Sequence, residues 1–223
     1  MLFAHDVSMC RQLISPAEWE QHGGWVLGDR EEWGNRACGA ATLRMVTLAY
    51  KGEAPAVVEL LHLGVKHKAL SERGWIHAGL AELATSVGVP ARAEAVAPKD
   101  LIGAIRAAPL IISVTERLPE DGRKGGHLIV ARGYTDAGDI LIRDPSGWGQ
   151  EHDRVAYSRL TSSYTGRAIT FAPAQEPARP YASGIASRKR KNPPAGAGGI
   201  RHAAGKAQKN TPDQNRIEPK LAA

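Results

Sequence analysis

Cys38 is the residue whose type and surroundings most clearly suggest covalent chemistry. It opens an apolar stretch, residues 38–50, and is followed directly by Gly39 and two alanines. If this stretch is a helix, the unpaired backbone N–H groups and the helix dipole at its start favour the thiolate over the thiol. A lone cysteine at a helix start is often only a small buried hydrophobic residue. The interpretation as a nucleophile therefore requires a base elsewhere in the chain.

Among the eight histidines, His127 has the setting that best suits such a base. It follows the glycine pair at 125–126, where the missing side chains would let a substrate backbone approach the imidazole. The alternative is a partly buried structural histidine. His62, His67 and His77 lie on or near predicted helices without the HExxH or Cys-x-x-Cys spacing of a metal site. We therefore predict no metal and no cofactor.

Asp144 is the residue that could orient this base. It ends a β-branched run, residues 139–144, that a short turn at 135–138 separates from the run beginning at His127, so the two runs should form a hairpin. In a hairpin, the end of the second strand returns to the level of the first strand's start. Asp144 should then lie near His127, hold its tautomer and stabilise its imidazolium form. The alternative is that the sequence Asp-Pro-Ser-Gly is only a turn.

The chain before Ala108 is predicted to be helical. Ser15, Pro16 and Glu18 form the capping-box pattern of a short helix. The Gly-rich, charged stretch 25–36 lacks periodicity and is predicted to be a loop that leads to Cys38. Apolar spacing, with Gly and Pro signals, predicts further helices over residues 38–50, 55–63, 75–87 and 98–107.

After Ala108 the residues become β-branched and the helical period disappears. Strands are predicted over residues 109–115, 127–134, 139–144 and 167–171, and residues 1–9 of the ambiguous segment 1–13 could supply an edge strand. A helical half that precedes a sheet half indicates an α+β fold, since a doubly wound fold would alternate helices and strands.

Charge divides the chain into two regions. Residues 174–223 carry ten Lys/Arg against three Asp/Glu, whereas the other 173 residues carry 19 against 20. The segment 174–223 is rich in Ala, Gly and Pro and has almost nothing to bury, so it is predicted to be a disordered basic tail. Residues 1–173 are predicted to be one folded domain. The basic run 188–191 could make weak contacts with nucleic acid or an acidic partner, or have no specific role.

Cysteine content and hydropathy indicate the compartment. Cys10 and Cys38 are the two cysteines of the chain, which is too few for a disulfide framework and fits a reducing environment. The N-terminal residues lack the pattern of a secretory signal, and no stretch is apolar enough to span a bilayer. We therefore expect a cytoplasmic protein without a membrane segment.

Four blocks of sequence resemble one known family. Residues 32–41, 74–80, 125–130 and 144–146 together resemble the papain-like cysteine peptidases of the bacteriocin-processing, double-glycine-peptidase-like group. The resemblance covers about residues 29–173. It implies the papain-like cysteine peptidase fold, with an N-terminal helical half and a C-terminal antiparallel sheet. It also implies that Cys38 is the nucleophile, His127 the base and Asp144 the orienting carboxylate.

The chain departs from this family pattern at Glu32. Family members usually have glutamine six residues before the nucleophile, where its side-chain amide helps to form the oxyanion hole, and here Glu32 stands at that position. An ionised carboxylate would repel a developing oxyanion, so Glu32 must be protonated, displaced or outside the hole. Asn35 could donate instead, with the backbone N–H of Cys38 as the other donor.

These residues allow three functions. The first is a cysteine peptidase or amide hydrolase, in which Cys38 attacks a peptide or amide carbonyl and water releases the thioester. The second is an acyltransferase that uses the same triad and passes the acyl group to an amine or alcohol. The third is a non-catalytic papain-like domain that binds peptides, which the carboxylate at Glu32 and the basic tail would favour.

Overall fold

The computed structural model describes residues 2–115, 118 and 126–173. The predicted tail, residues 174–223, lies outside the described residues. The helices are α1 (Pro16–Gln21), α2 (Arg30–Arg36), α3 (Cys38–Lys51), α4 (Val57–Lys66), α5 (His77–Ser86), α6 (Leu101–Ala107) and α7 (Tyr157–Ser163), with 3-10 turns η1 (Gly24–Val26), η2 (Pro98–Asp100) and η3 (Trp148–Gln150). Within the described ranges, no helix is both long enough and apolar enough to cross a bilayer.

The strands form one main sheet and one small hairpin. The main sheet has the strand order β4-β9-β5-β6-β7-β8, and β1 also pairs with β6; every pairing is antiparallel. Its strands are β1 (Leu2–Ala4), β4 (Ala91–Ala95), β5 (Leu110–Val114), β6 (His127–Thr135), β7 (Asp139–Arg143), β8 (Arg154–Ala156) and β9 (Tyr164–Phe171). The small hairpin joins β2 (Leu70–Ser71) and β3 (Gly74–Trp75).

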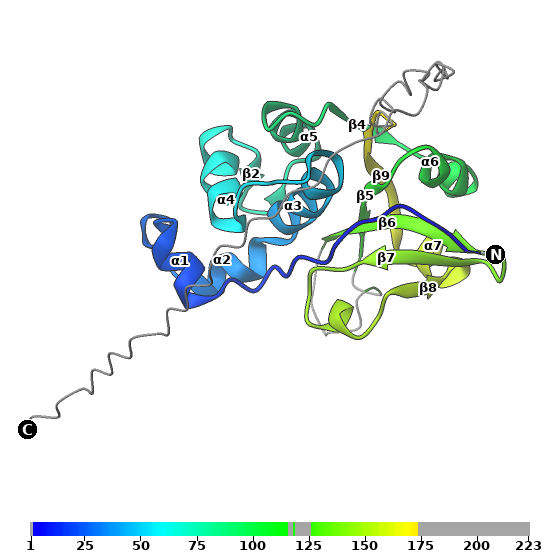
Figure 1. Ribbon diagram of the computed structural model, residues 1–223, viewed down its shortest axis with the longest axis horizontal. Helices are drawn as coiled ribbons and strands as arrows, with labels where there is room; N and C mark the ends of the chain where they lie inside the picture. The colour runs from blue at the N-terminus through cyan, green and yellow to red at the C-terminus, as the bar shows by residue number, and fades with distance from the viewer. Residues whose placement is uncertain (1, 116–117, 119–125, 174–223) are drawn as a thin grey trace, which may run out of the picture. The chain divides into compact units, whose positions relative to one another are not determined.

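Both faces of the main sheet are covered (Figure 1). On one face, sheet residues such as Leu128 and Val130 share a buried apolar cluster with residues of α3, α4 and α5. On the other face, Ile129 shares a second cluster with residues of α6 and α7. The alternation along β6 sends successive side chains into the two clusters, as the period of a strand requires. The predicted α+β organisation, with the helical half before the antiparallel sheet, is confirmed.

The predicted loop over residues 25–36 is wrong in its second half. Helix α2 begins at Arg30, because the Asp29 carboxylate accepts a 2.8 Å hydrogen bond from the backbone N–H of Glu32 and so caps the helix. Acidic side chains in the first turn and Arg36 in the last turn also suit the helix dipole. These terminal signals outweigh the lack of an apolar period in a helix this short.

Strand β4 was not predicted. Its sequence, Ala-Arg-Ala-Glu-Ala, lacks the β-branched residues that mark a strand, and its side chains are mostly exposed. Five consecutive residues nevertheless pair with β9, from Ala91 opposite Phe171 to Ala95 opposite Arg167. Tertiary pairing therefore decides this segment, and it makes β4 one edge of the main sheet.

The predicted cap at the start of α1 is present, but only one of its two bonds is local. The Ser15 hydroxyl accepts a 3.1 Å hydrogen bond from the backbone N–H of Glu18. The Glu18 carboxylate does not complete a capping box; it accepts a 2.9 Å hydrogen bond from the backbone N–H of Val57, at the start of α4. Glu18 therefore takes part in the starts of two helices, through its backbone N–H at α1 and through its carboxylate at α4.

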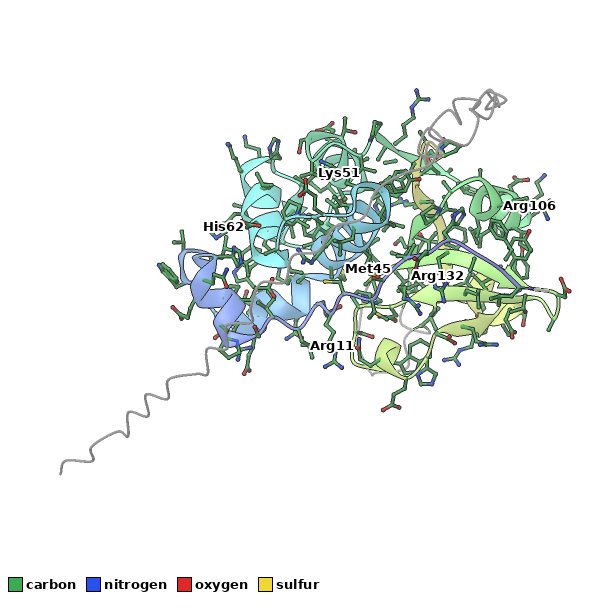
Figure 2. All side chains as sticks on the ribbon, in the orientation of Figure 1. Arg11, Met45, Lys51, His62, Arg106 and Arg132 are labelled. Atoms are coloured by element: carbon green, nitrogen blue, oxygen red, sulfur yellow. The ribbon has the colours of Figure 1, made fainter. Side chains whose placement is uncertain are left out.

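The N-terminal segment after β1 lies along the sheet and reaches the turn after β7. Figure 2 shows Arg11 and Arg132 along this path, where Arg11 Nε donates to Gln150 Oε1 at 2.7 Å. The backbone N–H of Gln12 donates to the carbonyl of Pro145 at 2.9 Å. These bonds attach the turn that follows Asp144 to the beginning of the chain.

Candidate active site

Cys38 is the first residue of α3, as the sequence predicted. Its neighbour Ala37 is the N-cap residue and makes no side-chain capping bond with the first turn of the helix. The thiol is partly exposed. The helix ends at Gly52, whose φ of 76° is the left-handed conformation typical of a glycine cap. Cys38 therefore lies at the N-terminus of α3, where the helix dipole favours the thiolate form of its side chain.

Trp75 holds the start of α3 in place. Its indole N–H donates a 2.8 Å hydrogen bond to the carbonyl of Arg36, just before the helix. Its ring lies so close to Gly39 and Gly64 that a Cβ at either position would collide with it. The glycine behind Cys38 is thus required by the indole. The sequence predicted Trp75 as the first residue of a helix, whereas it lies in β3, and its role was missed because a tertiary contact defines it.

His127 and Asp144 form a buried pair. His127 Nε2 and Asp144 Oδ1 are 2.8 Å apart, and the two residues are 1% and 0% exposed. The same Asp144 oxygen accepts a 2.8 Å hydrogen bond from the backbone N–H of Ser146. The β6–β7 pairing, with Val130 opposite Arg143, produces this proximity. The predicted hairpin and the predicted closeness of the two side chains are confirmed.

The electrostatics of the pair favour a charged imidazole. Burial opposes the charge on His127, but hydrogen bonds with Asp144 and Cys38, together with their negative charges, raise its pKa above the ordinary value. Burial likewise opposes ionisation of Asp144, but the bond with His127 and the N–H of Ser146 lower its pKa. Because Nε2 is used by Asp144, Nδ1 is the ring nitrogen left for Cys38. The three residues predicted from the sequence are therefore in contact in one chain of interactions.

Gly149 packs directly on Asp144, so replacing it with alanine is expected to disturb the pair. A Cβ at Gly149 would overlap the Asp144 carbonyl oxygen and Cβ, which are parts of the chain that cannot rotate away. We expect a loss of about 1–3 kcal/mol of unfolding free energy, measured by urea denaturation. Gly147→Ala is the matched control, because its Cβ meets nothing within 4 Å and its φ is −57°. Equal stability of the two variants would contradict the prediction.

A cavity of about 870 Å³ lies beside the pair. Cys38, His127 and Trp75 line it, and its sheet wall is formed by residues that include Ser113, Leu128, Ala168 and Arg167. The helical half contributes Asn35, His77 and the β2–β3 hairpin. The thiol and the imidazole thus face a space large enough for several residues of a peptide.

Glu32 and Asn35 differ in their relation to this cavity. Both residues are exposed on α2. Of the two, Asn35 lines the cavity with Cys38, and Glu32 is not among its lining residues within the described chain. The backbone N–H of Glu32 is used by the Asp29 cap. The residue that differs from the family pattern is therefore held in the first turn of α2, and the α2 residues at the cavity are Asn35 and Arg36, from its last turn.

Comparisons with known proteins identify the family and the fold of this chain. A sequence profile of the Peptidase C39 family matches residues 31–176. Among solved structures, the peptidase domain of Streptococcus ComA, a bi-functional ABC transporter of a quorum-sensing pathway, is 25% identical with a TM-score of 0.50, over 62% of this chain and 93% of that one. A comparison with curated proteins found no match.

A second solved structure supports the fold. A double glycine motif protease from an AMS/PCAT transporter, solved in complex with the leader peptide, is 20% identical with a TM-score of 0.52 over 76% of this chain and 94% of that one. The papain-like α+β fold implied by the sequence is thus found in solved relatives. Since the family profile also covers more than half of the chain and includes Cys38, His127 and Asp144, this protein belongs to the peptidase C39 family.

Proposed function

We propose that this protein is a cysteine peptidase that cleaves a peptide bond through a thioester on Cys38. His127 is the general base and acid, and Asp144 orients the imidazole and stabilises its protonated form. The observation that carries the proposal is the buried 2.8 Å contact between His127 and Asp144 beside a partly exposed thiol at a helix start. Nucleophile, base and orienting carboxylate are the three parts that acyl-transfer chemistry requires.

The reaction proceeds in two halves. The Cys38 sulfur attacks the scissile carbonyl carbon, a C–S bond forms, and the C–N bond breaks as His127 gives its proton to the leaving amine. Water then attacks the thioester, His127 accepts a proton from that water, and the C–S bond breaks to release the carboxylic acid product. The C–S bond leaves its electron pair on the sulfur, so the Cys38 thiolate again lies beside a protonated His127, which is the state in which the cycle began.

The oxyanion formed in each half needs hydrogen-bond donors. The backbone N–H of Cys38 is one donor, because the first N–H groups of α3 have no partner within the helix. The amide of Asn35 is the second donor in this proposal, since Asn35 lines the cavity with Cys38. Glu32 lies outside the hole, which removes the repulsion that its carboxylate would exert.

A peptide with a double glycine motif is the first substrate to test. The protease of the AMS/PCAT transporter was solved with a leader peptide, and this chain shares its fold. The cavity next to Cys38 includes the small side chains Ala78, Ala93 and Ala95. Such walls leave room for a peptide backbone close to the thiol.

Selective alkylation tests the nucleophile. Burial raises the pKa of Cys10 to about 11, so its thiolate is scarce at pH 7.5, whereas Cys38 lies at a helix start in contact with His127. We expect one equivalent of iodoacetamide to label Cys38 at least about 10-fold faster than Cys10. Peptide mass spectrometry identifies the labelled residue. The same labelling should stop cleavage of a Gly-Gly peptide. Faster labelling of Cys10, or cleavage that survives the loss of free Cys38, would contradict the proposal.

A further inference from the structure

Arg167 stands on the wall of the cavity that leads away from the catalytic pair. It is an exposed residue of β9 that lines the cavity with Cys38 and His127. Ile169 and Phe171, two and four residues further along β9, belong to the core cluster under the helices. Because alternate side chains of a strand share a face, Arg167 points to the sheet face that α3, α4 and α5 cover, and the cavity lies on this face.

No partner within the described residues neutralises this guanidinium. Arg167 makes no hydrogen bond or ion pair through its side chain with any described residue. The nearby carboxylate of Glu94 accepts a 2.5 Å hydrogen bond from the Thr170 hydroxyl instead. Arg36, also at the cavity, donates to the carbonyl of Ser71 at 2.9 Å. Arg167 is thus a cation at the cavity with its five N–H donors available.

Strand order gives the distance of Arg167 from β6, the strand that begins with His127. Leu128 of β6 pairs with Ser113 of β5, and the Thr165 hydroxyl of β9 donates to the Ser113 carbonyl at 3.1 Å. β9 is therefore two strands from β6, which at about 4.8 Å per strand is roughly 10 Å. An extended peptide rises about 3.3 Å per residue. Arg167 accordingly lies about three residues along a peptide that crosses the sheet from Cys38.

We infer that Arg167 is a specificity residue that binds a carboxylate of the peptide substrate about three residues from the scissile bond. This inference rests on the proposed function and adds its substrate class, a peptide with an acidic group at that distance. Guanidinium and carboxylate match in two parallel N–H···O bonds. The carboxylate can be that of an Asp or Glu side chain, or the free carboxyl end of the peptide.

The pKa of His77 responds to the positive charge of Arg167. Burial lowers the pKa of His77, and the positive charge of Arg167 lowers it further. His77 also lines the cavity, at the start of α5. The charge of Arg167 is therefore felt across the cavity, where it would also act on a bound carboxylate.

The test uses short Ala/Ser peptides with a central Gly-Gly pair, acetylated and amidated so that they carry no terminal charge. One glutamate is moved through the positions on both sides of the pair, and a glutamine peptide and a lysine peptide match each position. A further peptide carries a free carboxyl end at the same distance in place of the glutamate. The full chain is assayed as wild type, Arg167→Gln, Arg167→Glu and Arg154→Gln. Arg154 is the control because it is exposed on the far edge strand β8 and outside the cavity.

Two measurements are made on each pair of peptides. The first is kcat/KM for cleavage, and the second is the protection of Cys38 from iodoacetamide, which reports occupancy of the cavity without turnover. Wild type and Arg154→Gln should prefer the glutamate peptide by about 10-fold at one position about three residues from the pair. Arg167→Gln should lose the preference, and Arg167→Glu should favour a lysine peptide instead. The free-carboxyl peptide shows which source of the carboxylate is used.

The outcomes separate this inference from the proposed function. If wild type cleaves none of the peptides but glutamate protects Cys38 in an Arg167-dependent way, the peptidase proposal fails on these substrates and the carboxylate site stands. If wild type shows no acidic preference in either measurement, or if Arg167→Gln keeps the preference, the inference is overturned. If Cys38 of the Arg167 variants is alkylated at the wild-type rate when no peptide is present, a general loss of folding is excluded as the cause of a lost preference.

Discussion

Replacing Cys38 with alanine is expected to lower kcat for peptide cleavage by at least about 10³-fold. Without the sulfur no thioester forms, and water must attack the peptide carbonyl directly. Cys38 is partly exposed at the first turn of α3, so the smaller side chain leaves the core intact. Steady-state cleavage of a Gly-Gly peptide, with products identified by mass spectrometry, gives the loss, and a thermal or urea transition equal to that of wild type shows that the fold is kept.

Three further variants test this prediction more sharply. His127→Ala should lose a similar factor, and the double variant of Cys38 and His127 should be no worse than the single ones, because the two residues act as one unit. Cys10→Ala is the matched control, since Cys10 is a partly buried cysteine whose thiol has no part in the proposed reaction. Full activity of Cys38→Ala, or an equal loss in Cys10→Ala, would reject Cys38 as the nucleophile.

Asp144→Asn is expected to lower kcat/KM by about 10²- to 10⁴-fold, since it removes the charge that stabilises the imidazolium. The side chain keeps its size, so the effect reports charge and tautomer more than packing. Asn can also donate its N–H to the ring nitrogen that now faces Asp144 Oδ1, which would favour the wrong tautomer. Activity within a few-fold of wild type would show that Asp144 has no part in orienting His127.

The same substitution should change how stability depends on pH. In the folded wild type the pKa of His127 is raised and that of Asp144 is lowered. The histidine contribution is complete below its ordinary pKa of about 6.5 and is lost as pH rises through the raised value; the aspartate contribution is complete above about 4 and is lost as pH falls through the lowered value. The pair therefore stabilises the fold most between about pH 4 and 6.5.

Asp144→Asn removes the anion that raises the pKa of His127, and burial then acts against the charged ring. The variant should be less stable than wild type by about 2 kcal/mol at pH 6, and the difference should be smaller at pH 9, because the histidine contribution is lost as the pH rises through the raised pKa of His127. Urea unfolding of both proteins at the two pH values, under reducing conditions, measures the difference. A difference that grows towards pH 9 would contradict the stated pKa directions.

Residues whose roles depend on local structure could be predicted from the sequence alone. Cys38 was placed at a helix start because an apolar period begins there and Gly52 ends it, and such signals act within a few residues. The hairpin of β6 and β7 followed from a short turn between two β-branched runs, so the meeting of His127 and Asp144 could be predicted from strand geometry. The α+β class followed in the same way from the order of helical and strand periods.

Features that depend on contacts between distant segments could not be predicted from the sequence. The indole of Trp75 on Gly39 and the pairing of β4 with β9 join residues whose own sequence carries no sign of the partner. The position of Arg167 at the cavity follows from strand order, which propensity and period do not encode because they describe neighbours along the chain and not neighbours across a sheet.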